Sequence, residues 1–141
     1  MDFYTFSAND VDTATDAAME TLLWQAGDRT DEEGNTTGTT WDEDFDVDDF
    51  APGQRDKMRA LIEAFMNDEE ETNLEDLQTV KATPEQIGHD YVLTTGGHGA
   101  GFWDRGYGEA GERLSEVCRA ERAEWYLYVG ADDMLHCGDL D

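Results

Sequence analysis

The chain has 141 residues, of which 35 are Asp or Glu and 9 are Lys or Arg, so its formal net charge is −26 at pH 7. This charge argues against a basic patch that would bind DNA, RNA or an anionic membrane directly. No apolar run approaches the ~20 residues of a membrane span. The length suits one domain, residues 1–141, and 38% apolar residues provide a core. Cys118 and Cys137 form no short-spaced pattern, so we expect buried thiols in a soluble, intracellular protein.

Two helices are predicted in the first half of the chain. The first begins near Val11 with Asp10 as its N-cap, and Gly27 ends it. The second has Pro52 in its first turn. Its apolar residues follow the i, i+3, i+4, i+7, i+8 spacing of an amphipathic helix: Met58, Leu61, Ile62, Phe65 and Met66.

Between these helices, residues 28–49 hold ten acidic residues and one Arg, and we expect an acidic loop with one short extended piece. The candidate acidic face comprises Asp42, Glu43, Asp44, Asp46, Asp48 and Asp49. On an extended backbone, alternate carboxylates would face one side, about 6 to 7 Å apart. The run fails as an EF-hand because Val47 and Gly53 stand where the turn glycine and the bidentate Glu belong, so no metal site is predicted.

The second half of the chain predicts an α+β arrangement. Leu74 and Leu77 begin a short third helix, and Thr83 to Gln86 resemble a capping box for a single turn. Residues 90–94 are rich in strand formers and precede a glycine-dense turn, so a hairpin is predicted over about 88–106. A helix over 109–120 and strands at 125–129 and 134–137 follow. The predicted fold is two or three helices packed on a small antiparallel β-sheet, which consists of two hairpins with a helix between them.

The segment from Gly88 to Gly106 contains GHD, two apolar residues, LT, a short linker and HGAGFWDRG. It resembles a family of small acidic proteins encoded by bacteriophages and prophages, with weaker similarity outside this block. The chain departs from the pattern at Thr95, where the family has a basic residue. The resemblance implies a phage origin and expression in the cytoplasm of a bacterial host, and it implies no particular chemistry.

The same block holds a candidate loop site, formed by His89, Asp90, His98, Asp104 and Arg105. A hairpin could bring these side chains together as an acid/base or ligand-binding cluster. The structural alternative is a tight loop with Phe102 and Trp103 buried and with an ion pair between Asp104 and Arg105. The block contains no Ser or Cys nucleophile and no HExxH motif, so we predict no catalytic residue, metal or cofactor.

The charge itself suggests a function. A compact domain of this length has a diameter of roughly 37 Å, and a DNA duplex of that length carries about 22 phosphate charges. The charge is concentrated in residues 1–50, with 15 acidic residues and one basic residue. The leading hypothesis is therefore a non-enzymatic phage accessory protein that binds a basic surface of a host protein and, as a DNA mimic, inhibits a nucleic-acid-binding or defence protein. The alternatives are a small enzyme or ligand-binding module at the glycine-rich block, and a charge that serves only solubility or high-salt adaptation.

Overall fold

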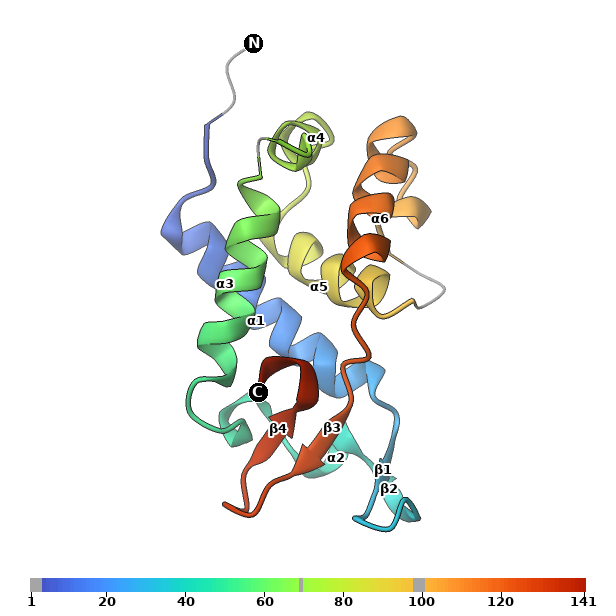
Figure 1. Ribbon diagram of the computed structural model, residues 1–141. Coiled ribbons are helices and arrows are strands. Elements are labelled where there is room, and N and C mark those ends of the chain that lie inside the picture. Colours follow the sequence, from blue (N-terminus) through green and yellow to red (C-terminus); the bar gives the residue numbers. More distant parts are fainter. Residues whose placement is uncertain (1–3, 69, 98–100) are drawn as a thin grey trace.

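The computed structural model describes residues 4–68, 70–97 and 101–141 (Figure 1). Its α-helices are α1 (Ala8–Gln25), α2 (Trp41–Asp44), α3 (Gln54–Met66), α4 (Asn73–Thr79), α5 (Pro84–Thr95) and α6 (Glu109–Glu121). Strands β1 (Asp28–Thr30) and β2 (Thr36–Thr40) form one antiparallel hairpin, and β3 (Leu127–Val129) and β4 (Leu135–Cys137) form another. Single 3-10 turns are η1 (Val47–Asp49), η2 (Phe102–Asp104) and η3 (Gly138–Leu140). The predicted α+β class is confirmed.

Helix α5 is the centre of the helical part, where it lies between α1 and α6 (Figure 1). Its most extensive contact is with α1. At this crossing Gly88 lies against the backbone of α1, and a Cβ there would overlap the carbonyl oxygen of Ala14. The absence of a side chain at position 88 therefore permits the two helices to approach closely.

An aromatic cluster joins α5 to its neighbours. The ring of Phe65 from α3 lies 5.0 Å from the ring of Tyr91 and 5.5 Å from that of Phe102, measured between centroids. Trp125, just before β3, packs on the other side of Tyr91 at 6.4 Å. One buried core thus extends from the helices to the C-terminal hairpin.

The hairpin predicted over about 88–106 is wrong. Residues 90–94 belong to α5, which runs from Pro84 to Thr95, and Phe102 and Trp103 lie in η2 instead of a return strand. The capping box of Thr83 and Gln86 begins this helix, so it starts three turns of helix and not one. A short apolar run has the same composition in a buried helix as in a buried strand, and here packing on several sides favours the helix.

Other boundaries differ less. Helix α1 begins at Ala8 because Ser7 is its N-cap, and Asp10 is the reciprocal partner in that capping box. Helix α3 begins after Gly53, so Pro52 lies outside it. Gly27 follows the end of α1 with a φ of 69°, as predicted. The two C-terminal strands are each shorter than predicted, and both cysteines are buried free thiols. Among the described residues, no helix combines the length and the apolar composition needed to cross a membrane.

Candidate functional site

We define the acidic segment as residues 28–49. It is not a loop with one extended piece, because it forms the β1–β2 hairpin, α2 and η1. Buried Trp41 anchors it to the core, and the ring of Phe45 stacks on Trp41 at 5.9 Å. All ten carboxylate residues of the segment are exposed: Asp28, Asp31, Glu32, Glu33, Asp42, Glu43, Asp44, Asp46, Asp48 and Asp49.

The carboxylates over 42–49 do not form the predicted row on one side of an extended backbone, because α2 and η1 coil this part of the chain. Asp46 and Asp49 form the capping box of η1. Asp44 accepts hydrogen bonds from Thr39 and from Arg29, and these bonds lower the pKa of its carboxyl group. Local hydrogen bonds therefore fix some of these carboxylates.

Other acidic side chains of the segment have weaker ties or none. Of the described residues, only Thr40 can donate to the carboxylates of Asp42 and Glu43, and its hydroxyl, at 2.5 and 2.9 Å, has one proton for the two of them. The carboxylates of Glu32 and Asp48 receive no hydrogen bond from any residue that the structure describes. These groups are free to meet a partner.

Arg29, the one basic residue of the acidic segment, is neutralised by an ion pair within the segment. The Arg29 guanidinium lies 2.9 Å from Asp44 and 4.7 Å above the centre of the Phe45 ring. A positive charge held against a carboxylate contributes little to the field beyond the pair. The outward field of the segment is therefore that of its carboxylates.

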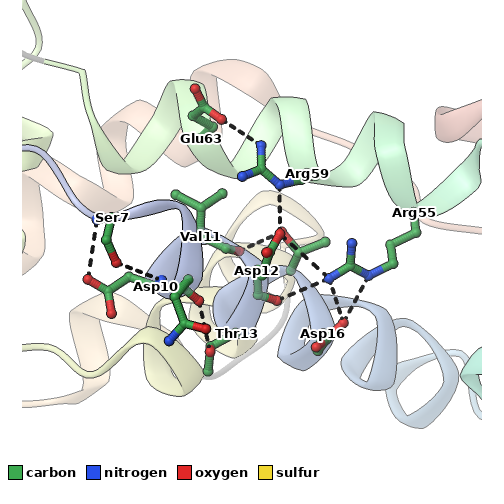
Figure 2. Close-up of polar contacts among 11 residues, drawn as sticks. Ser7, Asp10, Val11, Asp12, Thr13, Asp16, Arg55, Arg59 and Glu63 are labelled. Atoms are coloured by element: carbon green, nitrogen blue, oxygen red, sulfur yellow. Dashed lines mark hydrogen bonds and ion pairs between the residues drawn. The ribbon is translucent and has the colours of Figure 1, made fainter.

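Arginines elsewhere follow the same pattern. Figure 2 shows Arg55 and Arg59 of α3 reaching across to Asp12 and Asp16 of α1, with Arg59 also bound to Glu63. In the described part of the chain, the arginines that form ion pairs with carboxylates are Arg29, Arg55, Arg59, Arg105 and Arg113. Most of the Lys and Arg side chains are thus paired with carboxylates within the fold. The charge that remains on the surface is strongly negative.

The candidate loop site has a different character. Asp90 of α5 is buried, with 2% of its side chain exposed, and it accepts two hydrogen bonds from Arg105, at 2.7 and 3.0 Å. The hydrogen bond to Asp90 raises the pKa of Arg105. The prediction of an ion pair between Asp104 and Arg105 is wrong. Arg105 follows η2, and its guanidinium is directed back to Asp90 of α5. This bidentate pair holds η2 against α5.

His89 is next to Asp90 in sequence but is directed to α1. Its Nδ1 atom lies 3.0 Å from the Thr21 hydroxyl, and its ring is 5.7 Å from that of Trp24. His98 lies outside the described residues. Shallow cavities of about 330 and 420 Å³ border His89 and Arg105, but the Asp90 carboxylate is already bound by the guanidinium. His89 and Asp90 thus do not form an acid/base pair, and among the described residues no group of three or more His, Cys, Asp or Glu side chains is arranged to hold a metal ion.

Several other described residues of the block are also part of the packing. The Thr94 hydroxyl accepts a hydrogen bond from the backbone N–H of Phe102, and Gly101 packs directly on that hydroxyl. Thr95 is buried, and its hydroxyl accepts from the indole N–H of Trp125 at 2.8 Å. Phe102 is buried as predicted. Trp103 is 47% exposed, so the prediction that it is buried is wrong.

Sequence reasoning missed an ionic cluster on the C-terminal hairpin. His136 of β4 has Asp132 at 3.0 Å from Nε2 and Asp141 at 3.2 Å from Nδ1, and its ring stacks on Tyr128. Partial burial lowers the pKa of His136, but the two carboxylates outweigh it and raise the pKa above 6.5. The turn between β3 and β4 was a sequence signal that Asp132 and His136 lie close together. The sequence held no such signal for Asp141, because η3 places it there.

Comparisons with known proteins gave no relative: no family model matches the chain, and no curated protein or solved structure matches it.

Proposed function

We propose that this chain is a non-enzymatic protein that binds a basic surface of another protein through the acidic segment. The observation that supports this most is that all ten carboxylate residues of the segment are exposed while its one cation is bound to Asp44. Carboxylates gathered on one part of a surface attract a basic partner from a distance and accelerate encounter. They also repel acidic competitors, which gives selectivity.

The partner in this proposal is a nucleic-acid-binding or defence protein of a bacterial host, which the chain inhibits as a DNA mimic in the host cytoplasm. The net charge of −26 is of the same order as the roughly 22 phosphate charges of a duplex about as long as the domain is wide. The phage origin rests on the resemblance of residues 88–106. A cleft built to bind phosphates has lysines and arginines arranged for such a field.

The block around α5 and η2 favours neither an enzyme nor a ligand-binding module. Its buried carboxylate, Asp90, is engaged by Arg105, and Gly88 and Gly101 permit close packing of the backbone. The proposed function therefore rests on the acidic segment alone.

Two charge variants with equal net charge test the proposal. The segment variant carries Asp42→Asn, Glu43→Gln and Asp48→Asn, which keep an acceptor oxygen for Thr40 and leave the capping residues intact. The control variant carries Glu109→Gln, Glu112→Gln and Glu116→Gln on α6, a helix that lies at the other end of the molecule from β1 and β2 (Figure 1).

Each immobilised protein is exposed to bacterial lysate at low and high salt, and retained proteins are identified by mass spectrometry. We expect the wild type and the α6 variant to retain the same basic protein at low salt, and the segment variant to retain about tenfold less. A short DNA duplex should displace that protein. Equal retention by both variants would contradict the role of the segment, and retention of nothing by the wild type would indicate that the charge serves solubility alone.

A further inference from the structure

The two hairpins border a common groove. Its volume is about 410 Å³, and its lining comes from residues 29–32 of the acidic hairpin and residues 127–129 of β3. Figure 1 shows both hairpins at the same end of the molecule, away from α4 and α6. Nearly 100 residues separate the two sides in sequence, so only the fold brings them together.

On the β3 side, the groove meets a free strand edge. Gly130 N–H donates to Met134 C=O at 2.9 Å, and Gly138 N–H donates to Tyr126 C=O at 3.0 Å. Because hydrogen-bonded residues alternate along an antiparallel strand, the N–H and C=O groups of Leu127 and Val129 point away from β4. No residue in the described part of the chain hydrogen-bonds to these groups.

The far edge of the same hairpin is covered. Phe50 forms a parallel bridge with Leu135 of β4, and Ala51 N–H donates to Leu135 C=O at 2.8 Å. Proteins commonly cover or charge their strand edges because an open edge pairs with other chains. Here one edge of the hairpin is covered and the edge at the groove is open.

The acidic hairpin also has an open edge. Gly27 C=O accepts from Trp41 N–H, and Asp31 N–H donates to Asn35 C=O, so these residues pair toward β2. The register shifts between Asp28 and Thr30, but each of these residues is next to one that pairs toward β2, so its own backbone groups point away from β2. The described residues provide no partner for them either.

We propose that the groove docks an extended, basic segment of the partner protein, which pairs its backbone with the open edge of β3 and with that of β1. This inference rests on the proposed function and deepens it. Asp31 and Glu32 line the groove, and Arg29 is neutralised by Asp44, so the groove favours positive side chains. Main-chain hydrogen bonds supply affinity in strand addition, and side chains supply specificity.

The test uses a six-residue peptide of alternating Lys and Val, with a control peptide of the same sequence in which every Val nitrogen is methylated. Binding is measured by titration, and backbone hydrogen exchange is followed by NMR. In the free protein the Leu127 and Val129 amides should exchange quickly and the Tyr128 and Gly130 amides slowly. The peptide should protect Leu127 and Val129 while leaving Tyr128 unchanged.

A variant tests the edge directly. Val129→Pro removes one N–H that faces the groove and no hydrogen bond of the hairpin, so peptide binding should weaken about tenfold, whereas Val129→Ala should bind as the wild type does. If Val129→Pro does not fold, the hydrogen-exchange measurement on the wild type still shows whether the peptide pairs with the edge of β3.

The possible outcomes separate the two proposals. Binding of both peptides with unprotected Leu127 and Val129 amides would overturn the groove and leave the acidic segment as a binding surface. Binding of neither peptide at low salt would overturn the groove, and the lysate experiment with the charge variants would still test the proposed function.

Discussion

At the scale of single residues, Gly88 is a position where the fold leaves no room for a side chain. In an exposed helix, replacing Gly by Ala gains roughly 1 kcal/mol of helix stability. At position 88 the new methyl group would overlap the Ala14 carbonyl, and α1 would have to move. We expect Gly88→Ala to lower the free energy of unfolding by about 3 kcal/mol, measured by urea denaturation. A more stable variant would show that the helices cross less closely than described.

The ion pair between Asp90 and Arg105 gives a second residue-scale prediction. Arg105→Met leaves the buried Asp90 carboxylate without its partner, so we expect a loss of about 3 kcal/mol. Arg55→Met removes exposed pairs with Asp16 and Asp12 and a long hydrogen bond to the Asp12 carbonyl oxygen, and it should cost at most about 1 kcal/mol. The double variant Asp90→Asn with Arg105→Met should recover part of the loss. Equal effects of the two single variants in urea denaturation would exclude a special role for the buried pair.

At the scale of elements, the helices with clear periodicity could be predicted and the central one could not. Met58 and Ile62 show the spacing of an amphipathic helix because one face of α3 is exposed. Helix α5 is buried from Asp90 to Thr95, so no polar stripe interrupts its apolar run, and Tyr91 and Val92 suggest a strand. The capping box at Thr83 was the one local signal of its start.

The candidate site, too, could be predicted only in part from the sequence. The acidic segment stands out in the composition, but which carboxylates are free depends on side chains that the fold brings near, such as Arg29 beside Asp44. Asp90 could not be predicted as the partner of Arg105, because the helix that holds Asp90 was predicted as a strand. The groove between β1 and β3 could not be predicted, because the sequence of each strand by itself is that of an ordinary short strand.

The hairpin β3–β4 should show a pH-dependent stability. His136 has its pKa raised above 6.5 in the folded protein, so its charged form stabilises the fold fully below pH 6.5, and this contribution is lost as the pH rises through the folded-state pKa. Thermal melting between about pH 6 and pH 8 should show a falling Tm in the wild type. His136→Gln should have a smaller slope over this range. Identical slopes would mean that Asp132 and Asp141 do not hold a charged imidazole.

At the scale of the whole molecule, self-repulsion should govern stability. Within residues 4–68, 70–97 and 101–141, five arginines are bound in ion pairs, and most carboxylates have no cation beside them. Raising the salt from about 0.01 M to about 0.1 M shortens the screening length from about 30 to about 10 Å, which weakens repulsion across the molecule more than it weakens contacts within an ion pair. We expect Tm at pH 7 to rise over this range. A constant or falling Tm would show that the carboxylates repel one another less than the net charge suggests.

Binding of a basic protein by the acidic segment is best tested by measuring the dissociation constants of the captured partner for three proteins at one ionic strength. The segment variant at positions 42, 43 and 48 should bind about tenfold more weakly than the wild type. The variant at positions 109, 112 and 116 has the same net charge and should bind within about threefold of the wild type, because its substitutions lie on α6, away from the segment (Figure 1). Equal weakening by both variants would contradict a binding role of the acidic segment, since binding would then follow total charge.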